Sequence, residues 1–234
     1  IITMLNNHNS LVAARKCLQS IKNTKSFIDP YLIDATTPIE LNQHLKNFNL
    51  SLNDYSYPKS PAETQKHVKT GLELTGYRAS DYTKVVSCLV SHMRLWKLCK
   101  ELNETIIILE HDALFTTHFN IKKIQEKFTG GVMGLNDPIG ATRKAGLYDN
   151  LVKANYSVGN FQVPTIDKPH IPQGLAGNSA YIIKPEAATH LLDKVYEIGM
   201  WPNDALMCQQ FFPWLQQVYP YFTTIQGTKS STTL

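Results

Sequence analysis

The segment 106–115, Ile-Ile-Ile-Leu-Glu-His-Asp-Ala-Leu-Phe, constrains the fold more than any other part of the sequence. Four aliphatic residues in succession are typical of a strand buried on both faces of an α/β sheet. Such a strand ends where polar side chains can reach a ligand in the crevice at its carboxyl end. We therefore expect Glu110, His111 and Asp112 to lie at a ligand-binding edge of the sheet.

The two acidic residues of this segment suggest a cation. Carboxylates as close as those of Glu110 and Asp112 repel each other unless a positive charge compensates them. Carboxylate oxygens are the ligands that Mg²⁺ and Mn²⁺ prefer, so the strand end is a candidate metal site. A polar turn capped by Asp112 is the alternative, because the motif is short. The residues alone leave both interpretations open.

The length of the chain limits it to one large core. Its 234 residues can bury a single α/β core with at most a small appendage, and 43% hydrophobic with 18% charged residues is ordinary for a globular protein. No apolar run approaches the roughly 20 residues of a membrane helix. The opening Ile-Ile-Thr-Met-Leu is expected to be a strand and not a signal peptide.

The cysteines at 17, 88, 99 and 208 show neither a zinc-knuckle spacing nor a disulfide framework. Reduced thiols in a cytoplasmic protein, of a bacterium or a virus-infected cell, are the simplest prediction.

Positive charge is concentrated in the first part of the chain. Residues 1–100 carry 13 Lys and Arg against 7 Asp and Glu, a net +6, whereas residues 101–234 carry 10 against 12, a net −2. Within 59–100 the count is 8 against 3, a net +5. This region is either a solvated face or a surface for a polyanion, such as a nucleotide diphosphate or a nucleic acid.

Predicted strands and helices alternate along the chain, which is typical of a mostly parallel sheet flanked by helices. The segment 51–76 is expected to be a long loop, and 136–176 an irregular active-site region. We expect strands at 1–5, 27–33, 106–109, 130–135, 178–183 and 221–225, and helices at 10–21 with Ser10 as N-cap, 38–48, 81–102, 118–128, 185–198 and from 203.

His92 lies in the apolar stripe of the predicted helix 81–102. An imidazole in that position must be hydrogen-bonded, or its burial costs stability. A zinc site formed with Cys88 and Cys99 is excluded, because the two cysteines lie about 16 Å apart along the helix axis. Two interpretations remain: a hydrogen-bonded core histidine, or one that reaches the active-site crevice.

Four motifs follow one another along the chain: Ser-Cys-Leu-Val-Ser-His-Met-Arg-Leu-Trp at 87–96, Leu-Glu-His-Asp-Ala-Leu-Phe at 109–115, Gly-Asn-Ser-Ala-Tyr-Ile-Ile at 177–183 and Pro-Asn-Asp at 202–204. Their order and spacing resemble glycosyltransferase family 25, the lipooligosaccharide and procollagen β-galactosyltransferases. The resemblance covers roughly 80–232, and more loosely the first strand and helix. His111 replaces the middle Asp of the family motif, which removes a negative charge near the metal, and Ser87 replaces a Gly.

The resemblance implies a single GT-A-like α/β domain over 1–234, with a Rossmann-like, mostly parallel sheet flanked by helices. Residues 1–112 would form the half that binds the nucleotide sugar, and 113–234 the acceptor and catalytic half. It also implies an inverting transferase that moves a hexose from a UDP-sugar to an acceptor hydroxyl with the help of Mn²⁺ or Mg²⁺.

Site residues follow from the same resemblance and from the polar tail 226–231, which could close over the diphosphate or be a frayed terminus. Asp204 is the candidate general base, although an acid also suits the first turn of a helix. The candidate metal ligands are Asp112, His111 and Gln226, and the candidate donor-binding residues are Asn6, Asn7, Arg15, His92, Glu110, Asn178, Lys229 and Ser230.

The acceptor is expected to be a glycan of the lipopolysaccharide type. A hydroxymethylated base of viral DNA, reached by base flipping, is an alternative that the basic region permits. A metal-dependent phosphoesterase or nucleotidyltransferase, and a non-catalytic carbohydrate- or nucleic-acid-binding module, are alternatives from other functional classes. The sequence makes no prediction about the oligomeric state.

Overall fold

A mixed four-stranded sheet lies at the centre of the protein. The computed structural model describes residues 1–79, 81–142 and 144–227. In these residues the central strands follow the order β5 (Ile106–Leu109), β8 (Ala180–Ile183), β7 (Val132–Gly134) and β9 (Leu215–Gln217). β8 runs antiparallel to both β5 and β7, whereas β7 and β9 are parallel. A mostly parallel sheet is therefore not confirmed, since alternation along the chain does not reveal between which neighbours a strand inserts.

Three smaller pairings surround this sheet. β1 (Ile2–Thr3) pairs in parallel with β2 (Ile33–Asp34), and a parallel bridge joins Ile2 to Glu110 at the end of β5. β6 (Ala113–Phe115) pairs antiparallel with β10 (Thr223–Ile225), which brings the C-terminal segment beside the residues that follow β5. β3 (Thr64–Lys66) and β4 (Glu73–Thr75) form an antiparallel hairpin.

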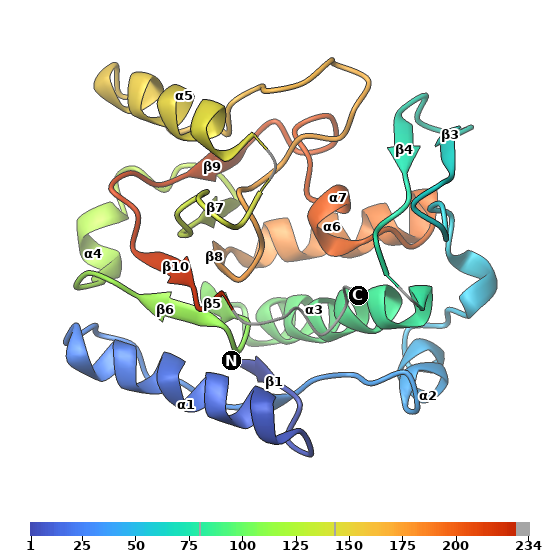
Figure 1. Cartoon of the computed structure of the whole chain (residues 1–234), viewed down its shortest axis with the longest axis horizontal. Helices are drawn as coiled ribbons and strands as arrows, with labels where there is room; N and C mark the ends of the chain where they lie inside the picture. The colour runs from blue at the N-terminus through green and yellow to red at the C-terminus, as the bar shows by residue number, and fades with distance from the viewer. Residues whose placement is uncertain (80, 143, 228–234) are drawn as a thin grey trace.

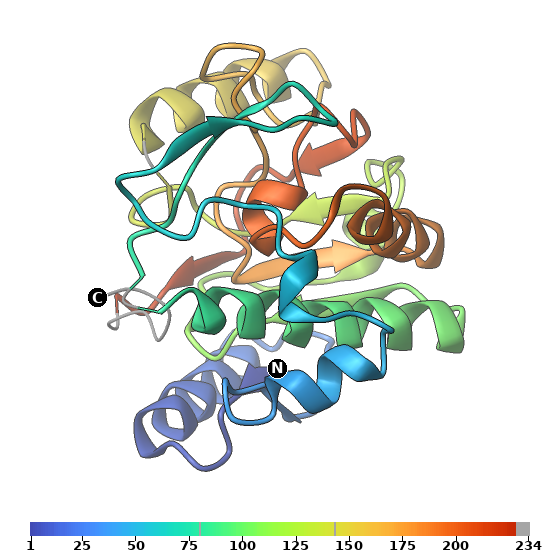
Figure 2. The ribbon, with the colours of Figure 1, turned by 90° about the vertical axis from the view of Figure 1, so that its right-hand side faces the viewer.

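Helices cover both faces of the sheet (Figure 1). α3 (Tyr82–Leu102) and α6 (Pro185–Ile198) pack against each other on one face, and α1 (His8–Asn23) and α4 (Ile121–Ile124) lie on the other. Because side chains alternate along a strand, Ile108 and Leu109 belong to opposite cores. The sheet is thus buried between two layers (Figure 2), as the aliphatic run predicted.

Well-capped helices match their predicted bounds closely. The Asp81 side chain accepts hydrogen bonds from the backbone N–H and the hydroxyl of Thr83 and so begins α3. α6 begins at Pro185 and ends before Gly199, whose φ of 93° few other residues adopt. Asn7, and not Ser10, caps α1, so that prediction was wrong: Ser10 Oγ instead accepts from the backbone of Met4.

Several short elements differ from the prediction. The expected strand 27–33 is reduced to β2, and the helix 118–128 to α4, while β6 and β9 were not predicted. The expected loop 51–76 contains a 3₁₀ turn (Leu52–Asp54) and the β3–β4 hairpin, whose first strand is fully exposed and therefore shows no apolar alternation. The region 136–176 contains α5 (Ala145–Ser157), which buries only two residues. The remaining helices are α2 (Leu41–Lys46) and α7 (Asn203–Leu206).

Among the described residues, no helix is long and apolar enough to cross a membrane.

Candidate active site

Three carboxylates from distant parts of the sequence gather at one edge of the sheet. Glu110 and Asp112 follow β5, and Asp204 lies in the first turn of α7. The largest effect on the pKa of Asp112, Asp204 and the Cys88 thiol is the limited solvation of each group. The negative charge of Glu110 further raises the pKa of both other carboxyls, and all three carboxylates raise the pKa of Cys88. The structure therefore brings the predicted base and the predicted metal-binding acids within electrostatic reach of one another.

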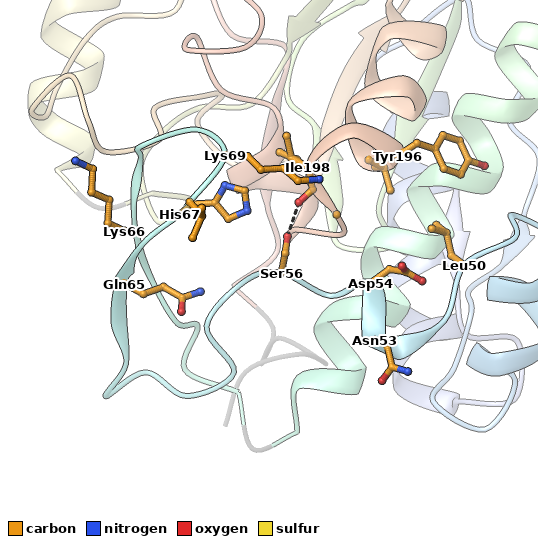
Figure 3. Close-up of a pocket in the computed structure, with 13 residues that line it drawn as sticks. Leu50, Asn53, Asp54, Ser56, Gln65, Lys66, His67, Lys69, Tyr196 and Ile198 are labelled. Carbon is orange, nitrogen blue, oxygen red and sulfur yellow. Dashed lines mark hydrogen bonds between the residues drawn. The ribbon is translucent and has the colours of Figure 1, made fainter.

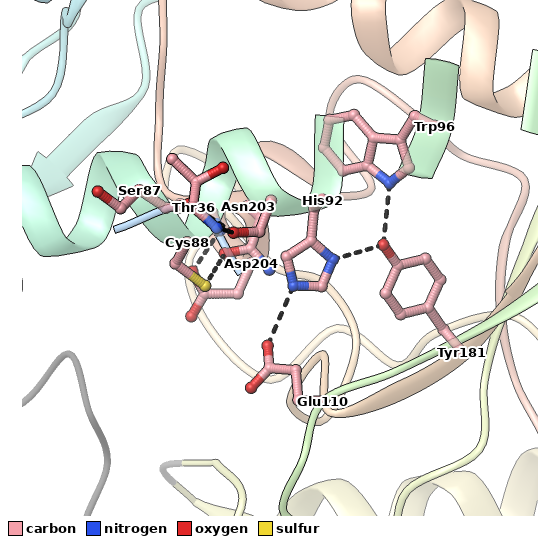
Figure 4. Close-up of polar contacts among 11 residues, drawn as sticks. Thr36, Ser87, Cys88, His92, Trp96, Glu110, Tyr181, Asn203 and Asp204 are labelled. Carbon is pink, nitrogen blue, oxygen red and sulfur yellow. Dashed lines mark hydrogen bonds and ion pairs between the residues drawn. The ribbon is translucent and has the colours of Figure 1, made fainter. Parts of the chain in front are cut away.

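A chain of hydrogen bonds fixes His92 in the core behind Glu110 (Figure 4). Trp96 Nε1 donates to the Tyr181 hydroxyl (2.9 Å), which lies 2.7 Å from His92 Nδ1, and His92 Nε2 lies 3.1 Å from Glu110 Oε1. An indole N–H only donates and an ionised carboxylate only accepts. Every proton finds an acceptor if Tyr181 donates to Nδ1 and the Nε2–H of His92 donates to Glu110, and we assign this tautomer.

His92 is therefore the hydrogen-bonded core histidine of the first interpretation, with no exposed surface. A direct contact between His92 and the donor stays a prediction. The apolar face of α3 buries the imidazole, and only its hydrogen bond reaches the site. His92 acts on the site by orienting Glu110.

The pKa values of the acids make the edge negative at neutral pH. Burial alone would raise the pKa of Glu110, but the hydrogen bond from His92 and the electrostatic influence of His92 and His111 hold it below its usual value. Burial and the charge of Glu110 raise the pKa of Asp112 to about 6. Burial lowers the pKa of His111, which outweighs the opposing effect of Glu110. His111 therefore does not compensate the negative charge of these carboxylates, whereas a bound cation would compensate it.

Two buried oxygens fit an oxygen-binding cation. Asp112 Oδ1 and Gln226 Oε1 have no hydrogen-bond partner among the described residues. The Gln226 amide is held in place by its nitrogen, which donates to the carbonyls of Ala13 (2.9 Å) and His111 (3.1 Å), and its backbone N–H donates to the carbonyl of Asp112 (2.9 Å). An unpaired buried acceptor costs free energy, and Mg²⁺ or Mn²⁺ bound to oxygen would remove that cost.

Asp204 opens into a cavity of about 850 Å³. The surrounding protein limits the solvation of the carboxyl, and this effect raises its pKa. A hydrogen bond from the Tyr77 hydroxyl lowers the pKa, whereas the charge of Glu110 raises it. The pKa of Asp204 therefore lies above its usual value. A raised pKa makes the Asp204 carboxylate a stronger base than a free one. The cavity walls include Tyr57 before the β3–β4 hairpin, Gly76, Tyr77 and Arg78 after it, Thr142, Lys144 and Tyr148 around the start of α5, and residues 171–175.

A second pocket, of about 500 Å³, lies between the β3–β4 hairpin and the end of α6 (Figure 3). Ser56, His67, Lys69 and Tyr196 are among its lining residues. Of the predicted catalytic, metal-binding and donor-binding residues that the structure describes, none lines this second pocket, and Asp204 lines the first cavity. The cavity that contains Asp204 is therefore the candidate active site.

The other predicted donor-binding residues are dispersed. Asn6, Asn7 and Arg15 are exposed near the start of α1, where Asn7 is the helix cap. Asn178 is buried, and neither atom of its amide has a hydrogen-bond partner among the described residues. It precedes Ser179, whose carbonyl accepts from the backbone N–H of Glu110 (2.8 Å). Lys229 and Ser230 lie outside the described residues.

Sequence reasoning missed the roles of Tyr77 and Tyr181. Tyr77 directly follows the segment 51–76 that was expected to be a loop, and nothing in its neighbourhood indicates a contact with Asp204. Tyr181 stands in the quoted motif 177–183, and its alternation with aliphatic residues on a buried strand could have indicated a polar partner in the core.

Part of the basic region serves the fold itself. The Lys59 ammonium lies 4.5 Å from the centre of the Tyr82 ring, and Lys69 Nζ donates to the carbonyl of Glu197 (2.6 Å). Arg94 donates to the carbonyl of Asp34 (2.8 Å). These contacts do not favour a nucleic-acid surface over a solvated face.

Comparisons with known proteins bear on the family. The sequence profile of glycosyltransferase family 25 (LPS biosynthesis protein) matches residues 15–207, which include His92, Glu110, Asp112 and Asp204. A search of curated proteins gives no match. Among solved structures, mouse xyloside xylosyltransferase 1 in its apo form is 14% identical, with 90% of this chain and 78% of that chain covered, at a TM-score of 0.37, which is too low to support an argument. The family match spans most of the sequence, and we conclude that the chain belongs to glycosyltransferase family 25.

Proposed function

We propose that this glycosyltransferase inverts the anomeric centre of a hexose as it moves the hexose from a UDP-sugar to a glycan hydroxyl, with the help of Mn²⁺ or Mg²⁺. Family membership supplies the reaction class. The observation that carries the finer proposal is the position of Asp204, in a large cavity and within electrostatic reach of Glu110 at the end of β5.

A GT-A-like fold is part of the proposal. The parallel pairing of β1 with β2 and the parallel bridge to Glu110 support a sheet that continues beyond β5. In such a sheet β8 alone would run opposite to the other strands. We propose that residues 1–112 bind the nucleotide sugar and that 113–234 supply the acceptor and catalytic half.

Asp204 acts as the general base. Inverting transfer requires that the acceptor oxygen attack the anomeric carbon on the face opposite the leaving diphosphate and lose its proton. The Asp204 carboxylate accepts that proton, because it opens into the cavity where an acceptor fits. Tyr77 lines the same cavity, and the interaction of its hydroxyl with the carboxylate lowers the pKa of Asp204.

Asp112 and Gln226 hold the cation, through the two buried oxygens that lack a partner among the described residues. A divalent cation bound there would stabilise the negative charge that develops on the leaving diphosphate. Glu110, oriented by His92, adds negative charge beside this position. His111 is a further candidate ligand, and Asn6, Asn7, Arg15, Asn178, Lys229 and Ser230 remain proposed donor contacts.

The cavity walls favour a saccharide acceptor. Tyr57, Tyr77 and Tyr148 line the cavity with Asp204. Tyrosines offer flat apolar rings to the faces of a pyranose and hydroxyls to its polar edge. We therefore propose a glycan acceptor.

A screen of nucleotide sugars tests the proposal. The protein is incubated with Mn²⁺ and a panel of UDP-hexoses, with and without oligosaccharide acceptors, and products are identified by mass spectrometry. Asp204→Asn should abolish transfer yet keep the donor affinity measured by calorimetry, because the amide retains the shape and loses the basicity. Asp193→Asn, at an exposed position of α6, is the control and should transfer normally. Wild-type transfer by folded Asp204→Asn, or loss of its donor binding, would contradict the assignment.

A further inference from the structure

Three side chains of different chemistry converge behind the acidic cluster. One ligand atom each from Cys88, His92 and Glu110 lies within 4.8 Å of the other two. Cys88 and His92 are four residues apart on α3 and share a face of the helix, whereas Glu110 follows β5. A sulfur, a nitrogen and an oxygen donor therefore meet at one point, held by two elements of regular structure.

The spacing is close to that of a tetrahedral metal site. Zinc bonds of about 2.0–2.3 Å place neighbouring ligand atoms about 3.3–3.7 Å apart. His92 Nε2 and Glu110 Oε1 are already 3.1 Å apart. The Cys88 thiol makes only a long hydrogen bond, 3.6 Å, to Asn203 Oδ1, so a shift of about 1 Å by its side chain would complete the triangle.

We propose that Cys88, His92 and Glu110 bind a thiophilic divalent cation of the Zn²⁺ type, and that its binding inhibits the transferase. Three protein ligands and an open fourth position are the arrangement of exchangeable zinc sites. The thiolate selects zinc or cobalt over Mg²⁺, which prefers oxygen. The site thus differs in ligand chemistry from the buried oxygens of Asp112 and Gln226.

Metal binding would change the hydrogen bonds around the three ligands. On binding, the Cys88 thiol releases its proton to solvent, and the single imidazole proton of His92 moves to Nδ1, which then donates to the Tyr181 oxygen. The Tyr181 hydroxyl proton loses its acceptor in this arrangement. That loss should weaken binding by roughly 10- to 100-fold relative to a fully satisfied site. Zinc in this position would therefore bind reversibly and act as an inhibitor.

Inhibition, which rests on the proposed function, follows from the position of Glu110. A cation bound to Glu110 replaces its hydrogen bond with His92 and adds positive charge beside Asp112. Both effects oppose the binding of Mn²⁺ at the neighbouring oxygens.

Cobalt spectroscopy tests the site without any need for activity. The full chain is freed of metal by a chelator and then titrated with Co²⁺. Ligation of Co²⁺ by a thiolate produces a charge-transfer band in the near ultraviolet. Zn²⁺ should abolish this band by displacing Co²⁺, whereas excess Mg²⁺ should leave it unchanged. Cys88→Ser should lose the band, and Glu110→Gln should weaken Co²⁺ binding by about 10-fold or more. Cys99→Ser is the matched control, since Cys99 is buried on the same helix and donates to the Glu104 carbonyl. Circular dichroism verifies that each variant is folded.

Three results would contradict the proposed metal site: the band persists in folded Cys88→Ser, it disappears in folded Cys99→Ser, or it never forms in the wild type. If sugar transfer is found, micromolar Zn²⁺ should inhibit transfer by the wild type and by Cys99→Ser but not by Cys88→Ser. Equal inhibition of all three proteins would refute the inhibitory role. If the band forms but no sugar is transferred, the metal site stands and the proposed function fails.

Discussion

His92 Nε2 lies 3.1 Å from Glu110 Oε1, and this contact joins the centre of α3 to the end of β5. Its geometry depends on Tyr181, which holds the opposite nitrogen of the ring. A buried aromatic residue on β8 is thus linked through His92 to a carboxylate of the candidate site.

The first prediction concerns Tyr181. Tyr181→Phe leaves the Trp96 N–H and His92 Nδ1 without their partner in the core, so we expect the free energy of unfolding to fall by about 2–4 kcal/mol. Urea denaturation measures it. Tyr31→Phe, at an exposed position, should change stability by less than about 0.5 kcal/mol. Equal stability of Tyr181→Phe and the wild type would show that the hydrogen-bond chain contributes nothing.

The second prediction separates stability from activity at Asp112. Its pKa of about 6 lies above the ordinary value, so the folded protein still holds this proton between about pH 4 and 6, where the unfolded chain has released it. Ionisation of Asp112 therefore destabilises the fold progressively as the pH rises through this window. Asp112→Asn cannot ionise, and in chelator it should be more stable than the wild type by about 1–3 kcal/mol above pH 6 and equally stable below pH 4.

Turnover of Asp112→Asn should nevertheless fall by about 100-fold or more, if Asp112 holds the cation. Thermal unfolding across pH and a transfer assay with Mn²⁺ provide the two measurements. A variant of unchanged stability would contradict the raised pKa, and one of unchanged turnover would remove Asp112 from the metal site.

The third prediction concerns the pH dependence of transfer. The Tyr77 hydroxyl lowers the pKa of Asp204, so Tyr77→Phe should raise that pKa further. A base must be deprotonated to act, and the acidic limb of the kcat profile should therefore move to higher pH, with kcat nearly unchanged on the alkaline side. Tyr148→Phe removes a different hydroxyl of the same cavity, which bonds to Gly174 and Gln217, and should leave the limb in place. Coincident limbs for Tyr77→Phe and the wild type would refute the role of Asp204 as base.

The fourth prediction addresses Gln226. Gln226→Ala removes a proposed oxygen ligand, and Mn²⁺ affinity measured by calorimetry should fall by roughly 10- to 100-fold. His111→Asp should raise the affinity, because it adds a carboxylate beside Asp112. Gln19→Ala, on the exposed face of α1, is the control. The ligand assignment fails if Gln226→Ala binds Mn²⁺ as the wild type does.

The predictable parts of this fold are those whose signal is local. The run 106–109 does form a buried strand of the sheet. Asp81, Pro185 and Gly199 mark helix ends by side-chain capping and backbone geometry that act within a few residues. The hairpin β3–β4 lacked such a signal because its first strand is fully exposed.

The candidate site was predictable only where one motif carried the residues. Glu110, Asp112 and Asp204 were named from the sequence. The hydrogen bond from Tyr77 to Asp204 depends on how the segment beyond the hairpin packs against α7, which no periodicity encodes. The tautomer of His92 depends in the same way on Tyr181, a neighbour supplied by another strand.

The pairing of β6 with β10 makes one corner of the candidate site depend on segments far apart in the sequence. Gln226 follows β10 and bonds to the carbonyls of Ala13 and His111, so residues from the start, middle and end of the described chain complete one corner of the site. A nascent polypeptide released from the ribosome before Gln226 would contain Asp112 and Asp204 but lack this corner. Cleavage between β10 and Gln226 is therefore expected to remove this corner while leaving Asp112 and Asp204 in place.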